Sequence, residues 1–288
     1  MRPDPHLGRL SALPRHGPDD GTASDAPAGA EAELGPGVTS DGARADPGPA
    51  GTDAVGGLPQ GAAGYAPLAE DLIRAWADLD AARLLSPILD LIPSPAEASR
   101  PLRALDLGAG DGRDVAFLAE QGWQATAVEP VAAFRQAGQA RDPRPNWLDD
   151  ALPDLPRLQD ESFDLILLIG VWQHLQRVER ARLIARLRDL CRPGGRLMIS
   201  IRLGPAAEGR PVVQSDPAEV REAFARAGFA LLRETDRGSI QPGNQARGVR
   251  WTWLALSERR ADDDLRHWHR LIAADAAGRS PRPPRSGC

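Results

Sequence analysis

Lysine is absent from this chain of 288 residues, and all 35 of its basic residues are arginine. Only two cysteines occur, Cys191 and Cys288, so the sequence supports neither a disulfide framework nor a cysteine metal site. Aromatic residues make up 5% of the chain, and no basic cluster is interleaved with them as on a nucleic-acid-binding face. Because the net charge is also negative, at −5, we expect no nucleic-acid partner.

Long hydrophobic runs are missing as well. No segment approaches the roughly 20 consecutive apolar residues of a membrane span, and the N-terminus lacks the apolar block of a secretory signal. We therefore expect a cytoplasmic protein without a membrane partner. The oligomeric state is left open.

The two ends of the chain differ in composition from its middle. Residues 1–64 are rich in Gly and Pro and contain no aromatic residue, which predicts a disordered low-complexity tail. The same composition predicts a disordered tail at 279–288. One folded domain is expected over 65–257, with an appended helix over 258–278.

Between the tails, strand-like and helix-like runs alternate. Buried strands are expected at 103–109, 123–130, 162–171 and 196–203. Helices are expected at 112–122, 177–191 and 217–228, with one or two more over 67–92. The run at 162–171 is the most apolar in the chain, as in a central strand that is covered on both faces.

The last two strand-like runs, 229–235 and 249–257, are joined by a loop without helical pattern. Because no crossover helix separates them, they should pair antiparallel. The sequence therefore predicts an α/β fold of the Rossmann-like, doubly wound type. Its sheet is mostly parallel with an antiparallel last strand, and helices cover both faces.

The segment "ALDLGAGDGRDVAFL", residues 104–118, predicts a strand, a glycine turn and a helix. Gly108 and Gly110 leave the turn without side-chain bulk, so a ligand can reach the backbone and the free N–H groups of the following helix. Glu129 ends the second strand, 23 residues after Asp106, where its carboxylate can accept hydrogen bonds from both ribose hydroxyls. This spacing indicates a nucleoside ligand.

The residues of the turn also indicate the charge of the ligand. Arg113 stands where a dinucleotide motif would have its third glycine. Asp106 and Asp111 add negative charge, which would repel a pyrophosphate and suits a cation.

With these features the chain resembles the class I S-adenosylmethionine-dependent methyltransferases. The resemblance covers about residues 65–256. It rests on four segments in order, "LDLGAGDG" (105–112), "AVEP" (127–130), "DESFDLILLIGVWQHL" (160–175) and "LCRPGGRLMIS" (190–200). It implies S-adenosylmethionine as the cofactor.

The resemblance also implies which residues meet the cofactor. Asp106 would contact its ammonium, Glu129 its ribose, and either Asp149 or Asp150 its adenine, with Asp150 favoured because Ala151 follows it. The residues implied to bind the cofactor are Tyr65, Asp106, Gly108, Ala109, Gly110, Asp111, Glu129, Pro130, Asp149, Asp150, Ala151, Ile169 and Gly170. Of these, Ile169 and Gly170 would lie near the sulfonium, and Tyr65 would close over the site.

The implied activity is methyl transfer to an acceptor. His174 is the candidate general base, and a purely structural histidine is an equal alternative. The short loop after the fifth strand favours a small-molecule acceptor. Two other functions remain as alternatives, an NAD(P)-dependent oxidoreductase, which Arg113 disfavours, and a non-catalytic regulatory protein that binds S-adenosylmethionine.

Two further features, a histidine pair and a tryptophan pair, are expected to have no catalytic role. His267 and His269 follow three aspartates, but residues two apart on a helix point in different directions, so no metal site is expected. Trp251 and Trp253 alternate with their neighbours on the last strand and should belong to the core or to the pocket wall.

Overall fold

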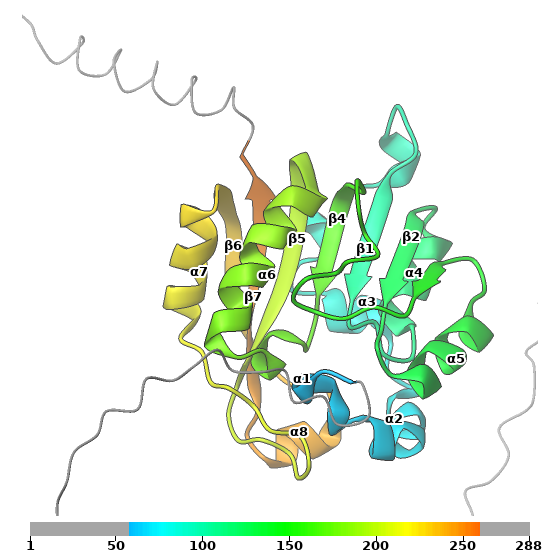
Figure 1. Cartoon of the computed structure of the whole chain (residues 1–288), viewed down its shortest axis with the longest axis vertical. Coiled ribbons are helices and arrows are strands. Elements are labelled where there is room, and N and C mark those ends of the chain that lie inside the picture. Colours follow the sequence, from blue (N-terminus) through cyan, green and yellow to red (C-terminus); the bar gives the residue numbers. More distant parts are fainter. Residues whose placement is uncertain (1–57, 260–288) are drawn as a thin grey trace, which may run out of the picture. The chain divides into compact units, whose positions relative to one another are not determined.

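The computed structural model describes residues 58–259 (Figure 1). The expectations for residues 1–57 and 260–288, including the C-terminal tail, Cys288, His267, His269 and nearly all of the helix at 258–278, fall outside the described residues. None of the described helices is long and apolar enough to cross a membrane.

A seven-stranded sheet forms the centre of the domain, in the order β3-β2-β1-β4-β5-β7-β6. Its strands are β1 (Arg103–Leu107), β2 (Gln124–Val128), β3 (Asn146–Leu148), β4 (Phe163–Leu168), β5 (Cys191–Leu203), β6 (Phe229–Gly238) and β7 (Arg250–Glu258). Strands β1 to β5 pair in parallel, whereas β7 runs antiparallel to both β5 and β6. The predicted Rossmann-like sheet with its reversed last strand is confirmed.

Helices and short 3-10 turns surround the sheet. The helices are α1 (Gln60–Ala63), α2 (Ala69–Trp76), α3 (Ala81–Leu85), α4 (Arg113–Glu120), α5 (Ala132–Arg141), α6 (Arg177–Leu190), α7 (Pro217–Arg226) and α8 (Pro242–Ala246). The 3-10 turns are η1 (Ala66–Leu68), η2 (Leu89–Leu91), η3 (Pro95–Glu97) and η4 (Trp172–His174). Helix α7 begins as its sequence predicts, because the Asp216 carboxylate accepts the Ala218 N–H and Pro217 occupies the first helical position.

The two faces of the sheet bury different side chains, as the period of two in a strand requires. Leu105, Ile166 and Ile199 pack with α6 and α7 on one face. Leu165 and Met198, one position along their strands, pack with α3 and α4 on the other. Figure 1 shows α6 lying across the sheet beside α7. Because β4 is buried along its whole length, it is the central strand that its composition predicts.

Three local expectations are wrong. Residues 60–63, within the segment expected to be disordered, form α1. The loop between the last two strands, expected to have no helix, contains α8. Strand β5 begins at Cys191, in the stretch expected to end the preceding helix, and its pairing with β4 is irregular between Phe163 and Leu165. Both missed helices are too short to show a helical period.

Candidate active site

A cavity of about 390 Å³ opens at the carboxyl edge of the parallel strands. The turns after β1, β2 and β4 line it together with β5, and α1 and α2 contribute residues from before the sheet. The reversed strand β7 contributes Trp251 and Trp253, which are therefore pocket wall. A cavity at this edge of an open α/β sheet is where such folds bind their ligands.

The turn after β1 is built on glycines in the left-handed region. Gly108 has φ +69°, and a Cβ there would lie 2.6 Å from Val171 Cγ2, so the turn packs against the segment after β4. Gly110 has φ +56°, and a Cβ there would meet nothing closer than Trp76 at 3.5 Å. The backbone at Gly110 is therefore open to a ligand, whereas Gly108 is needed for the fold of the turn itself.

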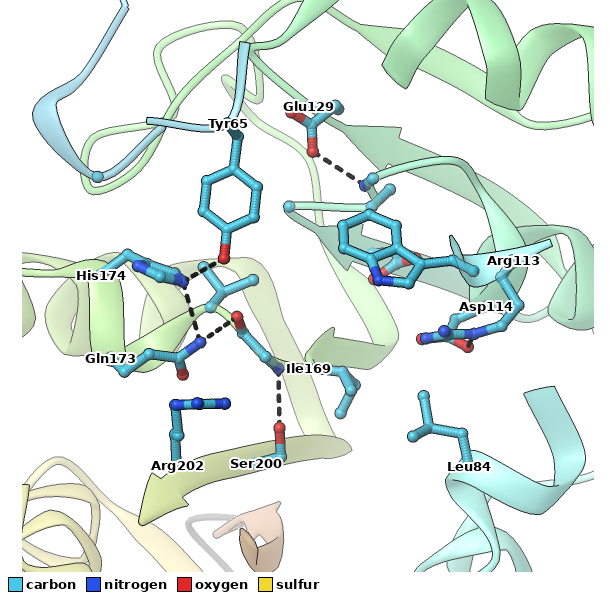
Figure 2. A pocket seen from close by; sticks show the side chains of 18 of the residues that line it. Tyr65, Leu84, Arg113, Asp114, Glu129, Ile169, Gln173, His174, Ser200 and Arg202 are labelled. Atoms are coloured by element: carbon cyan, nitrogen blue, oxygen red, sulfur yellow. Dashed lines mark hydrogen bonds and ion pairs between the residues drawn. The ribbon is translucent and has the colours of Figure 1, made fainter. Parts of the chain in front are cut away.

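Glu129 joins this turn to the end of β2. Its Oε2 accepts the N–H of Gly110 at 2.9 Å (Figure 2). Its Oε1 accepts the N–H of Val131, also at 2.9 Å. Burial raises the pKa of Glu129, although both N–H donors and the charge of Arg135 oppose the shift. Each carboxylate oxygen accepts one bond from the backbone and keeps capacity for another from a ligand hydroxyl.

Asp106, the buried acid of β1, carries an unsatisfied oxygen. Its side chain lines the cavity and is 3% exposed, and its Oδ2 has no hydrogen-bond partner among the described residues. Burial and the negative charges of Asp114, Glu129 and Asp111 raise the pKa of Asp106 well above its usual value, against the opposing charge of Arg113. A cationic ligand group would satisfy this carboxylate.

The other charges of the turn are paired within the protein. Arg141 Nη2 lies 2.5 Å from Asp111 Oδ2, and Arg113 forms two hydrogen bonds to Asp114 at 2.7 and 2.8 Å. The carboxylates of Asp111 and Asp114 are therefore already paired, whereas that of Asp106 keeps an oxygen free for a ligand. Among residues 58–259, no three His, Cys, Asp or Glu side chains gather as metal ligands.

The two acids after β3 lie in different places. Asp150 lines the cavity with Ala151, but its carboxylate accepts the N–H groups of Ala151 and Arg157, each at 2.8 Å. Asp149 is exposed, pairs with Arg135 at 2.8 Å and is not part of the lining. Of the two, only Asp150 is in reach of a ligand.

Tyr65 and His174 meet across the mouth of the cavity. The Tyr65 hydroxyl lies 2.7 Å from His174 Nε2 (Figure 2). His174 Nδ1 lies 3.2 Å from the carbonyl oxygen of Pro211. A carbonyl can only accept, so Nδ1 carries the hydrogen and Nε2 accepts from Tyr65. Burial and the charges of Arg210 and Arg202 lower the pKa of His174 to about 4, although its bond to Pro211 opposes the shift. The imidazole is therefore neutral at physiological pH.

Aromatic packing holds Tyr65 in place. Its ring meets that of Phe134 on α5 edge to face, with centroids 6.4 Å apart, and Trp76 on α2 stacks on the same Phe134 at 5.4 Å. The segment before the sheet thus lies against α5 and covers the cavity from outside the strands.

The turn after β4 provides the remaining expected residues. Ile169 and Gly170 line the cavity, and the N–H of Gly170 donates to Ser200 Oγ on β5 at 2.8 Å. The Gln173 amide donates to the Gly170 carbonyl oxygen at 2.5 Å. The backbone beside Gly170 is thus fixed from both sides.

Many of the lining residues have no counterpart among the sequence expectations, and they include Arg202 on β5 and Arg210 in the loop after it. Nothing in the sequence could distinguish these two arginines, because every basic residue is arginine and most arginines are exposed. Asp149 aside, the structure brings all the expected site residues to the cavity.

Comparisons with known proteins agree with this geometry. Residues 105–199 match a family model described as a methyltransferase domain. Uncharacterized methyltransferases of Mycobacterium tuberculosis and Mycobacterium bovis are 32% identical to this chain over 137 residues, which is 46% of this chain and 53% of the relative. The chain thus spans about half the length of the curated relatives it matches.

Solved structures with the same fold include two methyltransferases. The Burkholderia thailandensis 1,6-didemethyltoxoflavin-N1-methyltransferase, solved with 1,6-didemethyltoxoflavin and S-adenosylhomocysteine, has a TM-score of 0.53 at 24% identity over 68% of this chain and 86% of its own. The magnesium protoporphyrin IX methyltransferase of Synechocystis was solved with S-adenosylhomocysteine. It has a TM-score of 0.53 at 16% identity, over 67% of this chain and 95% of its own. At these identities the likeness establishes the fold.

The neutral His174 makes stability depend on pH. Its folded pKa of about 4 lies below the unfolded value of 6.5, so the unfolded chain binds more protons between them and stability is lost as pH falls through this window. Between about pH 7 and pH 5, the free energy of unfolding of the wild type should fall by about 2 kcal/mol more than that of His174→Gln. Urea denaturation at constant ionic strength measures the free energy of unfolding of both proteins at each pH. The same pH dependence in the wild type and in His174→Gln would contradict the assigned protonation state.

Proposed function

This chain carries a class I S-adenosylmethionine-dependent methyltransferase domain, and from that premise we propose that it methylates a small-molecule acceptor. The observation that carries the proposal is the conjunction of an open glycine turn, a buried acid with an unsatisfied oxygen and a strand-end glutamate around one cavity. These groups match the amino-acid and ribose parts of the cofactor.

The residues fit the cofactor group by group. Asp106 Oδ2 would accept from its ammonium, and Glu129 would accept from its ribose hydroxyls while still holding Gly110 and Val131. Backbone groups at Gly108, Ala109 and Gly110 would meet the methionine carboxylate, with Asp111 beside them. Pro130 would line the ribose, and Asp150 with Ala151 the adenine.

When bound, the cofactor supplies a methyl group that its sulfonium already activates. The protein must therefore chiefly orient the acceptor and exclude water, and orientation of this kind can contribute roughly 7–11 kcal/mol. The fixed backbone at Ile169 and Gly170 would set the position of the reacting centre. Tyr65, held by His174 and Phe134, would close the site.

A small acceptor is supported by the size of the cavity. About 390 Å³ lies at the lower end of the range for small-molecule sites, and part of it is needed for the cofactor. The loop between β5 and α7 is short, which leaves no room for an inserted substrate domain. One solved relative is named for the small molecule 1,6-didemethyltoxoflavin, which is consistent with this class of acceptor.

The role of His174 follows from its tautomer. Its Nε2 lone pair faces the cavity and accepts from Tyr65, and with a pKa of about 4 it is a weak base. We propose that His174 positions the Tyr65 hydroxyl, and that it takes a proton from an acceptor only where that hydroxyl turns away.

Calorimetry distinguishes this proposal from the oxidoreductase alternative. The full chain should bind S-adenosylmethionine and S-adenosylhomocysteine but not NAD. Glu129→Gln should lower the affinity for S-adenosylhomocysteine by about tenfold or more. The amide has a single acceptor oxygen, whereas the carboxylate has two. Glu120→Gln on the exposed face of α4 is the matched control and should bind as the wild type does. Binding of NAD without response to the other two compounds would overturn the proposal.

The raised pKa of Asp106 predicts that cofactor binding depends on pH. The ammonium needs the ionised carboxylate, whereas the ligand-free protein holds Asp106 protonated to a higher pH than usual. Affinity for S-adenosylhomocysteine should therefore rise from the lower to the upper pH of the measured range, with proton release on binding. In Asp106→Asn the rise should be lost, and the affinity at the upper pH should fall by about tenfold. An unchanged pH slope in this variant would remove Asp106 from the ammonium site.

Transfer of a labelled methyl group into a small-molecule cell extract tests catalysis directly. The wild type should label a compound of low molecular mass, and a chain that binds cofactor but labels nothing would favour the regulatory alternative. His174→Gln should lower turnover while leaving S-adenosylhomocysteine affinity within about twofold, since His174 lies at the acceptor side of Tyr65. Unchanged turnover would exclude His174 from the reaction.

A further inference from the structure

Two arginines line the acceptor side of the cavity without an acidic partner. Arg202, near the end of β5, is 7% exposed, and its Nε is buried without a hydrogen-bond partner among the described residues. Its other nitrogens reach only neutral oxygens, the carbonyl of Pro205 at 2.7 Å and Asn244 Oδ1 at 3.4 Å. The Nε of Arg210 is likewise buried and unpartnered, and its guanidinium lies 5.5 Å from the centre of the Tyr65 ring.

This arrangement differs from that of Arg113 and Arg141, although the buried Arg180 on α6, outside the cavity lining, also reaches only carbonyl oxygens. Arg113, which lines the cavity opposite Arg202, pairs with Asp114 at 2.7 Å, and Arg141 pairs with the cavity residue Asp111 at 2.5 Å. Within residues 58–259, no carboxylate lies within 4.0 Å of Arg202 or Arg210. Because a buried guanidinium without a counter-ion is costly, a bound anion would lower the free energy of this side of the cavity.

The pKa shifts of neighbouring groups reflect the positive charge of these two arginines. Arg202 and Arg210 both contribute to the low pKa of His174. Burial lowers the pKa of Arg202 itself, and the charges of Arg247 and Arg210 add to the effect. Figure 2 shows Arg202 on the side of the cavity that holds Gln173 and His174, opposite Arg113 and Asp114.

We propose that the methyl acceptor carries an anionic oxygen group, a carboxylate or a phosphate, which Arg202 and Arg210 bind. This inference rests on the proposed function. The planar guanidinium fork matches both kinds of anion, and the contacts it makes to them are stronger than those between neutral groups. Trp251, whose ring centre lies 5.6 Å from the Arg202 guanidinium, would pack against the apolar body of the acceptor.

The strand sets the distance between the anionic group and the reacting centre. Ser200, which holds Gly170, and Arg202 lie two residues apart on the same face of β5, about 7 Å along the strand. A small aromatic acid such as benzoate is about as long as this separation along the strand. This is why aromatic acids are suitable probes.

Binding of matched probes to the full chain saturated with S-adenosylhomocysteine tests the proposal. Ligand-observed NMR would compare benzoate with benzamide, which has the same shape without charge, and phenyl phosphate with benzylammonium. Benzoate or phenyl phosphate should bind about tenfold or more tightly than the uncharged and cationic probes, and the better of the two distinguishes a planar from a tetrahedral anion. Equal binding of benzoate and benzamide, or no binding of any anion, would overturn the proposal.

Variants then assign the binding to the two arginines. Arg202→Gln and Arg210→Gln should each lower the affinity for the anionic probe by about tenfold. Arg202→Lys should keep part of the affinity that Arg202→Gln loses. Arg226→Gln on the exposed face of α7 removes the same charge away from the cavity and should bind as the wild type does. An equal loss in Arg226→Gln would show a general charge effect and contradict the assignment.

The cofactor measured in the same samples separates this inference from the proposed function. S-adenosylhomocysteine affinity should stay within about twofold in every arginine variant, which also reports that each variant is folded. A large loss in Arg202→Gln would mean that the arginine binds the carboxylate of the cofactor and would overturn the inference. If the wild type failed to bind S-adenosylhomocysteine but still preferred anions in the absence of the cofactor, the proposed function would fail while the anion site would stand.

Discussion

The Glu129 carboxylate holds together the two strand-end turns on which the site depends. One oxygen binds the N–H of Gly110 after β1 and the other that of Val131 after β2, each at 2.9 Å. The turn at Gly110 has a left-handed backbone and no side chain to anchor it. Its position relative to β2 is set by this bond together with those from the Gly108 and Ala109 N–H groups to the Val128 carbonyl oxygen, at 2.8 and 3.1 Å. Burial strengthens both Glu129 bonds because water cannot compete with the N–H donors. Asp106, one residue before the end of β1, lines the same cavity as this turn.

Different strands carry the negative and the positive groups that face the cavity without an ionic partner among the described residues. Asp106 on β1 keeps an unsatisfied oxygen, and Arg202 and Arg210 lie on and after β5. Between them the turn after β4 presents neutral backbone, held by Ser200 and Gln173. Parallel strands make this arrangement, because every carboxyl end reaches the same edge while neighbouring strands keep their ends about 5 Å apart. Opposite charges can therefore face one ligand assembly without neutralising each other directly.

The features that the sequence predicts are those that neighbouring residues determine. The strand, glycine turn and helix at 104–118 form from contiguous residues, and Glu129 follows from the one-strand spacing of a βαβ unit. Arg202 and Arg210 come from a strand and a loop whose meeting at the cavity depends on the whole sheet. In a chain whose basic residues are all arginine, their side chains carry no pattern that separates them from exposed arginines. Helix α8 was missed for a different reason, because its five residues are too few to show a period.

Neutrality of His174 is a consequence of the same division of charge. A protonated imidazole there would place a third cation beside Arg202 and Arg210 in a partly dry site, and the low pKa of about 4 reflects that cost. The neutral ring keeps one donor for the Pro211 carbonyl and one acceptor for Tyr65, and both are used. Tyr65 thus receives a fixed orientation from a partner that brings no charge of its own. In the proposed reaction a cationic sulfonium would enter this cavity, and a neutral partner for Tyr65 avoids adding to the repulsion that two arginines already exert on it.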